Sequence, residues 1–218
     1  MDIEGHAPTD SVAFWERIYQ ARSRPSTGIP NAILASVAPR LKASRALDLG
    51  CALGDDAIWL ARNGWTVTAV DVSATALERA AARAVTLGVA DRIDFQQHDL
   101  AHTFPAGAFD LVYALYLQSP IDFDRDRALR SAAAAVAPDG RLLVVVHGSV
   151  QPWSWNQEPH PRFPTPQEQF DALELAAGEW DVEINDTPRR QATGPNGETA
   201  TATDVVTLVH RRSRAAID

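Results

Sequence analysis

The residues best suited to chemistry lie where two expected strands end. Gly50 and Gly54 follow the short apolar strand expected at 45–49, and Asp71 follows the β-branched strand expected at 65–70. Glycines let the backbone approach a ligand closely, and an acid at the tip of an adjacent strand can accept hydrogen bonds from both hydroxyls of a ribose. The spacing therefore predicts a site for a nucleoside.

A dinucleotide would need a phosphate site, which this turn lacks. The G-x-G-x-x-G pattern of dinucleotide sites is absent, and Asp55 and Asp56 stand where the next helix should begin. Two carboxylates at a helix N-terminus repel a pyrophosphate. They tolerate or favour a ligand with a sulfonium and an α-amino group, so the pattern favours a cationic nucleoside.

The segment 48–54 resembles the first motif of the class I S-adenosylmethionine-dependent methyltransferases. It departs from their usual pattern at Ala52, where the family commonly has glycine. The resemblance implies that Asp71 holds the ribose of S-adenosylmethionine. It also implies that Asp99, after the strand expected at 93–97, bonds to the adenine amine.

The resemblance covers most of residues 14–147 in the family's order, including 109–115 and 138–142. Within the family, the chain looks most like the branch that includes tellurite-resistance and thiopurine-type methyltransferases, which act on small nucleophiles. The segments that carry this likeness are Phe14-Trp15 with Tyr19, Gly28-Ile29-Pro30-Asn31, 57–65 and 193–197.

The cofactor-binding residues that we predict lie at strand ends or on the first helix. They are Trp15, Tyr19, Asp48, Gly50, Cys51, Gly54, Asp71, Val72, Asp99, Leu100 and Tyr113. Cys51 is more simply a packing residue there than a nucleophile.

The acceptor-side residues that we predict are aromatic or basic and come later in the chain. They are Tyr116, His147, Trp153 and Trp155. His147 follows the buried strand expected at 141–146 and is the candidate general base, although a lone histidine is more often simply hydrogen-bonded. The two tryptophans either wall the substrate pocket or pin their own proline-rich loop.

Alternating strands and helices predict an α/β fold with a Rossmann-like, doubly wound, mostly parallel seven-stranded sheet and a C-terminal antiparallel hairpin. We expect helices at 14–19, 33–39, 56–62, 73–87, 124–136 and 165–177, strands at 45–49, 65–70, 93–97, 109–115 and 141–146, a turn at 138–140, and hairpin strands at 182–190 and 201–210.

We expect residues 1–218 to form one methyltransferase domain. Its parts are N-terminal lid helices at 1–40, a cofactor-binding core at 45–147, a substrate-side loop at 148–166, and a C-terminal helix and hairpin at 167–210.

Composition narrows the classes of partner. The net charge of -8 disfavours nucleic acid, and no apolar run is long enough for a membrane span or signal core, which favours a cytoplasmic protein. One cysteine and no clustered Cys/His ligands imply neither a disulfide nor a metal site. We expect a monomer or homodimer.

The expected activity is in-line methyl transfer from S-adenosylmethionine to a small thiol, chalcogen, hydroxyl or amine, which leaves S-adenosylhomocysteine. Two alternatives remain from the sequence: a non-catalytic S-adenosylmethionine-binding protein, and an NAD(P)-dependent oxidoreductase on a Rossmann sheet.

Overall fold

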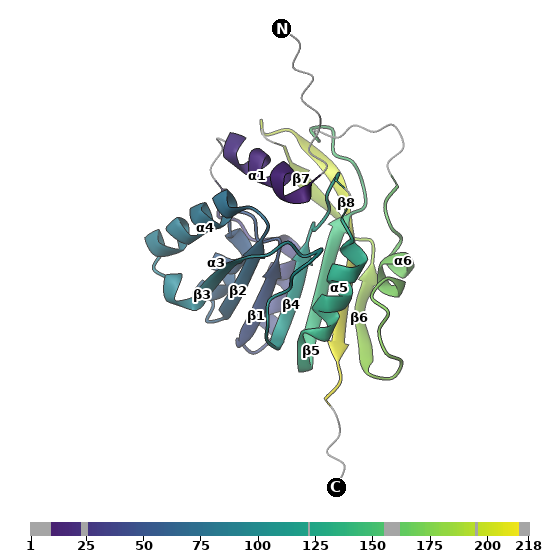
Figure 1. Cartoon of the computed structure of the whole chain (residues 1–218). Coiled ribbons are helices and arrows are strands. Elements are labelled where there is room, and N and C mark those ends of the chain that lie inside the picture. The colour runs from purple at the N-terminus through teal and green to yellow at the C-terminus, as the bar shows by residue number, and fades with distance from the viewer. Residues whose placement is uncertain (1–9, 23–25, 122, 155–161, 195, 214–218) are drawn as a thin grey trace.

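One eight-stranded sheet runs through the molecule (Figure 1). The computed structural model describes residues 10–22, 26–121, 123–154, 162–194 and 196–213. The strands are β1 (Arg45–Leu49), β2 (Thr66–Asp71), β3 (Ile93–Gln97), β4 (Phe109–Leu115), β5 (Val136–His147), β6 (Trp180–Asp186), β7 (Arg189–Thr193) and β8 (Thr199–Arg211). The helices are α1 (Ser11–Ala21), α2 (Ala32–Val37), α3 (Asp55–Arg62), α4 (Ala74–Thr86), α5 (Arg125–Ala134) and α6 (Pro166–Asp171), with 3-10 turns at Ala38–Arg40 and Ala90–Arg92.

The strand order is β3-β2-β1-β4-β5-β8-β6, with β7 paired to β8 outside this path. The pairs among β1 to β5 are parallel, and β8 is antiparallel to β5, β6 and β7. The structure therefore confirms the Rossmann-like, mostly parallel sheet with antiparallel strands near the C-terminus.

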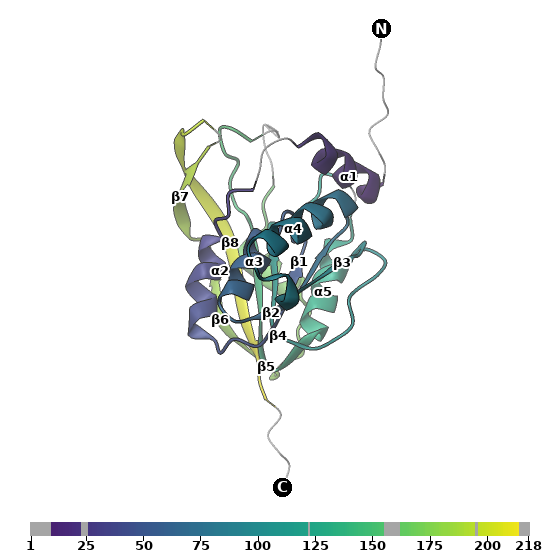
Figure 2. The same cartoon turned by 90° about the vertical axis from the view of Figure 1, so that its left-hand side faces the viewer.

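Helices cover both faces of the sheet. Buried side chains of α2 and α3 belong to one core cluster, and those of α5 belong to another on the opposite face (Figure 2). Along β4 the side chains alternate, because Leu111 and Tyr113 join the first cluster while Val112 and Ala114 join the second. A strand buried on both faces is typical of the middle of a parallel sheet.

The predicted turn at 138–140 is wrong, because these residues form part of β5. Val136 pairs with Phe109, but the next pair is Arg141 with Leu111, so the intervening residues bulge out of the ladder. Asp139 takes a φ of 67°, and α5 has already ended at Ala134. Because of this bulge, β5 can begin at Val136 and still pair in regular register with β4 from Arg141 onward.

The C-terminal segment contains three strands where the sequence predicts two. The strand expected at 182–190 is interrupted at Thr187 and Pro188, which separate β6 from β7. Proline lacks the N–H that a continuous strand would donate. The helix expected to reach Ala177 ends at Asp171, and the turn that follows buries Leu173.

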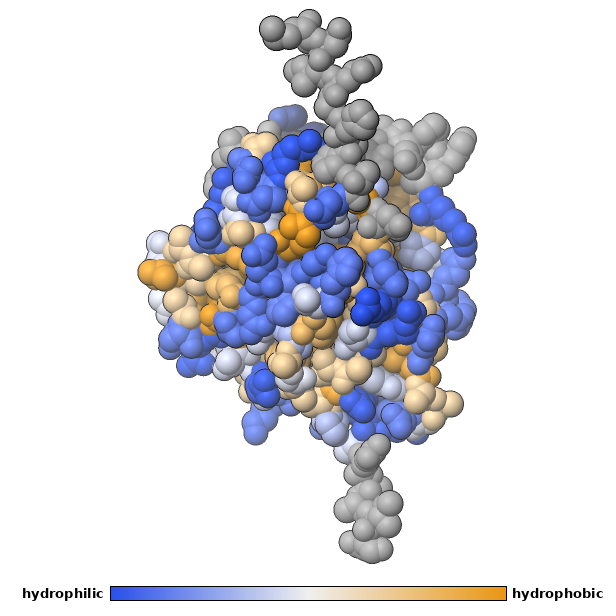
Figure 3. Space-filling model, in the orientation of Figure 1, coloured by the Kyte–Doolittle hydropathy of each residue, from blue (hydrophilic) through white to orange (hydrophobic). Residues whose placement is uncertain are grey.

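The helix α1 lies across the carboxyl edge of the sheet (Figure 1). Most of the surface in this view is hydrophilic, with apolar side chains showing below α1 (Figure 3). None of the described helices is both long and apolar enough to cross a membrane. Among the described residues, no cluster of His, Cys, Asp or Glu could hold a metal ion.

Candidate active site

A cavity lies between α1 and the carboxyl ends of β1, β2 and β4. Its lining comprises Ser11, Trp15, Tyr19, Gly50, Asp71, Val72, His98, Asp99, Leu100, Tyr116, Leu117, Gln118, Ser119 and Phe123. A second hollow adjoins it and is lined by Tyr19, Arg22, Ser26, Ile29, Pro30, Asn31, Gly50, Ala52, Leu53, Asp55, Asp56, Leu115 and Tyr116. The two share Tyr19, Gly50 and Tyr116, so they form one elongated site.

Three residues of the turn after β1, Gly50, Ala52 and Gly54, adopt left-handed backbone conformations. Gly50 has a φ of 75°, and a Cβ there would lie 2.9 Å from Leu117 Cδ1. Ala52 has a φ of 51°, a region that favours glycine, at the position where the resembled family commonly has that residue. The turn therefore keeps the family's backbone shape at the expense of some strain in Ala52.

Asp71 ties this turn to β2. Its Oδ2 accepts from Ala52 N and its Oδ1 from Ser73 N, both at 2.9 Å. Burial raises the pKa of Asp71, whereas the backbone hydrogen bonds oppose that rise. Each carboxylate oxygen retains a lone pair for a ligand hydroxyl. Asp71 lines the cavity.

Several predicted cofactor residues lie under the cavity lining. Asp48 and Tyr113 are buried, and Asp48 Oδ2 and the Tyr113 hydroxyl have no hydrogen-bond partner among the described atoms. Burial raises the pKa values of Asp48 and of the Cys51 thiol well above their usual values. Gly54 begins α3, where a Cβ would approach Ala80 Cβ at 3.0 Å. None of these four residues lines either hollow, so their support of the site is indirect.

The two acids at the start of α3 are not both free charges. Asp55 Oδ1 lies 2.7 Å from Arg83 Nη2 and also accepts from Gly28 N. Asp56 Oδ1 accepts from Asn31 N at 2.6 Å, and burial raises its pKa to about 6. Both acids line the second hollow, but Arg83 balances the charge of Asp55, so Asp56 is the one of the two without an ion-pair partner among the described residues.

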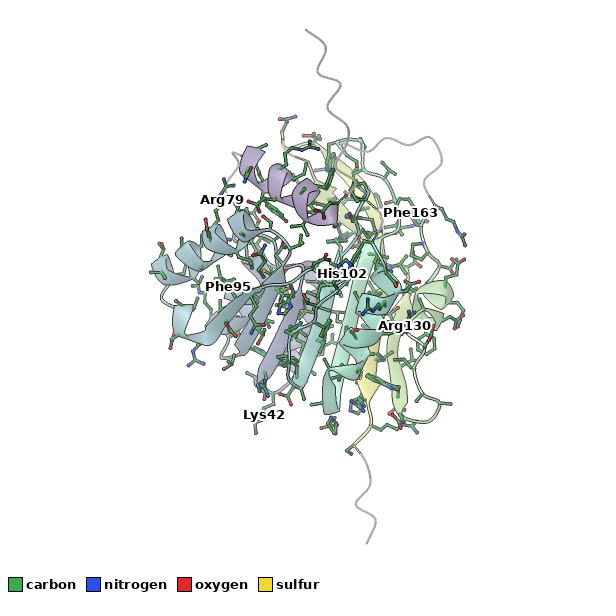
Figure 4. All side chains as sticks on the ribbon, viewed as in Figure 1. Lys42, Arg79, Phe95, His102, Arg130 and Phe163 are labelled. Carbon is green, nitrogen blue, oxygen red and sulfur yellow. The ribbon has the colours of Figure 1, made fainter. Side chains whose placement is uncertain are left out.

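Asp99 lines the other end of the cavity, beside Val72 and Leu100. Its Oδ1 accepts from Ala101 N at 3.1 Å, and its Oδ2 lies 2.8 Å from His102 Nδ1. His102 is seen at the edge of the sheet in Figure 4. These contacts fix the carboxyl group before any ligand binds.

Side chains of α1 and α4 fasten α1 over the cavity. Glu16 accepts from Ser73 Oγ at 2.6 Å and from the backbone N–H and hydroxyl of Thr75. These hydroxyl contacts lower the pKa of Glu16 to about 2. Arg79 reaches from α4 to the carbonyl oxygens of Tyr19 and Arg22 (Figure 4). We call these contacts the α1 latch.

The acceptor-side residues gather around Tyr116. Its ring stacks on His147 with the centroids 4.1 Å apart, and its hydroxyl donates to Asp204 at 3.1 Å. Asp204 is buried and paired with Arg190. His147 and Trp153 line neither hollow, and Trp155 lies outside the described residues.

Sequence reasoning missed Glu16, Gln118, Ser119, Arg190 and Asp204. Of these, only Asp204 carried a usable signal, because it is a charged residue directly before the apolar run at 205–209. Such a residue in a buried strand requires a partner. The partner, Arg190, could not be named from the sequence.

The family model described as a methyltransferase domain matches residues 46–140. This segment is a class I S-adenosylmethionine-dependent methyltransferase domain. It contains β1 to β4 and the start of β5, and therefore Gly50, Asp71 and Asp99.

Curated relatives match about half of the chain. Methyltransferase GfsG from Streptomyces halstedii is 38% identical over 112 residues, which is 49% of this chain and 40% of that protein. The 27-O-demethylrifamycin SV methyltransferase from Amycolatopsis mediterranei is 37% identical over 113 residues, which is 51% of this chain and 41% of that protein. The chain thus matches less than half the length of these relatives.

A solved structure extends the likeness of fold to nearly the whole chain. It is described as "Conversion of a Disulfide Bond into a Thioacetal Group during Echinomycin Biosynthesis". The TM-score is 0.72 at 22% identity, and the match covers 94% of each chain. This similarity shows that the strands and helices outside 46–140 also follow a known arrangement.

Proposed function

We propose that this protein transfers the methyl group of S-adenosylmethionine to a small-molecule nucleophile. The observation that carries the proposal is the cavity under α1, where the close-approach glycine Gly50 and the strand-end acid Asp71 line one wall. The residues present fit a nucleoside with a positively charged tail, because acids stand at both ends of the site and Asp71 lies between them.

We assign the ends of the donor to different acids. Asp71 would accept hydrogen bonds from the ribose hydroxyls, and Asp99 would face the adenine beside Val72 and Leu100. Asp56 would face the α-ammonium group in the second hollow. When bound, the donor supplies a methyl carbon that a nucleophile's electron pair attacks while the C–S bond pair returns to sulfur.

The chain's own contribution is to orient, to exclude water and to take a proton. α1 covers the cavity, with Trp15 Nε1 donating to Ser119 Oγ at 3.3 Å. Tyr116 forms the wall between the two hollows. His147 is the proposed base for a protic acceptor, because burial and Arg190 lower its pKa and so favour the neutral imidazole.

Calorimetry with S-adenosylmethionine, S-adenosylhomocysteine, NAD and NADP tests the donor assignment. We expect both sulfur ligands to bind and neither dinucleotide to do so. The Asp71→Asn variant should bind S-adenosylmethionine at least about tenfold more weakly, because it loses a charge-assisted hydrogen bond. Asp94→Asn, which changes an exposed acid on the adjacent strand, is the matched control. Binding of NAD without either sulfur ligand would overturn the proposal.

Transfer itself is tested with radiolabelled methyl donor and panels of thiols, phenols, amines and chalcogen oxyanions. Label should appear in at least one panel at neutral pH. Tight binding of the donor with no transfer to any panel would instead favour a non-catalytic S-adenosylmethionine-binding protein.

A further inference from the structure

The backbone of Tyr116 is strained. It follows β4 with a φ of 57°, a left-handed conformation that bulky side chains rarely adopt. Such strain is unfavourable and persists only where surrounding contacts hold the residue in place. Its backbone N–H donates to Val145 O at 2.7 Å, so the neighbouring strand supplies one of those contacts.

The other contacts come from a half-buried ion pair on β7 and β8, in which Asp204 is the buried partner. Arg190 Nε lies 2.7 Å from Asp204 Oδ2, and Arg190 Nη2 donates to the Tyr116 hydroxyl at 3.0 Å. The same hydroxyl donates to Asp204 Oδ2. Tyr116 therefore accepts from one partner and donates its only proton to the other. Its hydroxyl is committed to holding the ring in place.

His147 depends on Tyr116 for its place. The two rings are nearly parallel, at 12°, and the described residues offer no hydrogen bond to either imidazole nitrogen. Only its backbone N–H is engaged, by Gln118 Oε1 at 3.1 Å. Since stacking is the contact that orients the imidazole, whatever fixes Tyr116 also fixes His147.

We propose that Arg190 and Asp204 are positioning residues whose ion pair holds Tyr116, which lines the cavity, and through it His147, which stacks on the outer side of the Tyr116 ring. As the electron pair of the acceptor forms the bond to the methyl carbon and the C–S bond pair returns to sulfur, the acceptor's proton passes to a free nitrogen of His147. The imidazolium then releases that proton to water. This inference rests on the proposed function for its kinetic readout, but its structural part can be measured without any acceptor.

The two partners carry opposite charges and should act oppositely on His147. The charged and titratable groups that face it are Arg190 on β7, Asp204 on β8 and Tyr116 after β4. Arg190 lowers the pKa of His147 and Asp204 raises it. Arg190→Met should therefore raise that pKa, and Asp204→Asn should lower it. A pair that lies too far from the imidazole to act on it predicts no such opposition.

The first experiment is an NMR titration of the imidazole protons in the full chain, with the His147 signal assigned by its loss in His147→Gln. We expect midpoint shifts of opposite sign in Arg190→Met and Asp204→Asn. Arg189→Met, an exposed arginine on the same strand, is the matched control and should leave the midpoint unchanged. Shifts of the same sign, or none, would overturn the proposal.

The second experiment uses an acceptor found in the methylation panels. We expect Arg190→Met and Tyr116→Phe each to lower kcat about tenfold or more, because a small misplacement of a reacting group is expensive. The KM for the donor should stay within about twofold, and Arg190→Lys should recover part of kcat. The double variant should be little worse than either single one.

The outcomes separate this inference from the proposed function. If the midpoints shift in opposite directions but the wild-type chain transfers no methyl group, the inference about His147 is retained and the proposed methyl transfer is refuted. Methyl transfer with unchanged kcat in folded Arg190→Met and Tyr116→Phe would retain the activity and overturn the positioning role.

Discussion

Replacing Glu16 by glutamine should loosen α1 without unfolding the sheet. The carboxylate accepts from Ser73 Oγ and from two groups of Thr75 at the N-terminus of α4, where a negative charge is also favoured by the helix dipole. Glutamine keeps one acceptor oxygen but loses the charge. The substitution thus removes the charge of Glu16 from the α1 latch and leaves the size of the side chain nearly unchanged.

The free energy that Glu16→Gln removes can be estimated from these contacts. A hydrogen bond to a charged group contributes about 1 kcal/mol more than a neutral one, and partial exposure of Glu16 limits the total to about that value. At roughly 1.4 kcal/mol per factor of ten, 1 kcal/mol corresponds to about a fivefold larger open population of α1.

Hydrogen exchange measures that population directly. Amides of α1 should exchange about fivefold faster in Glu16→Gln, while those of β4 and β5 should not change. Glu78→Gln, the same replacement at an exposed site on α4, is the matched control. Equal α1 exchange in the wild type and Glu16→Gln would refute the latch.

The latch should also depend on pH. The pKa of Glu16 in the folded chain is about 2, below its usual value of 4.5. A lowered carboxyl pKa means that its contribution is fully present above about pH 4.5 and is lost as the pH falls toward 2.

Three further predictions concern the other end of the site. Because burial raises the pKa of Asp56 to about 6, its carboxyl destabilises the fold increasingly as the pH rises from about 4 through 6. Asp56→Asn should therefore be about 1–2 kcal/mol more stable than wild type to urea at pH 8, equally stable near pH 4, and weaker in S-adenosylmethionine binding. Ala52→Gly should stabilise by about 0.5–1 kcal/mol in urea unfolding, since relief of left-handed strain exceeds the entropy of glycine; a loss of stability would contradict the strain. Gly50→Ala should weaken S-adenosylmethionine binding more than tenfold by calorimetry, because its Cβ meets Leu117; unchanged affinity would show that the close approach is not needed.

Local signals predicted much of the fold. The bounds of β1, β3 and β4 agree with the sequence expectation because short apolar runs end at small or charged residues. Asn31, Ser73 and Thr165 cap their helices, a role typical of these residue types, because each hydroxyl or amide satisfies N–H groups only two or three residues away.

The misses have a common physical cause. Arg83 pairs with Asp55 across 28 positions, and Glu16 meets Ser73 across 57. Such partners are chosen by the packing of helices, which no local pattern encodes. The position of Tyr113 has a different reason. Because β4 is buried on both faces, its apolar run does not indicate which side chains face the ligand, and Tyr113 lines neither hollow.

The position of β8 has a consequence for the order in which the parts of the site become available during synthesis. β8 follows every other strand along the chain, yet it lies between β5 and β6 and carries Asp204. During synthesis the Gly50 turn and Asp71 can assemble long before β8 is available. Arg190 and Tyr116 gain their shared partner only at the end. A partly made chain that stops before β8 would therefore contain the Gly50 turn and Asp71 while Arg190 and Tyr116 still lack Asp204.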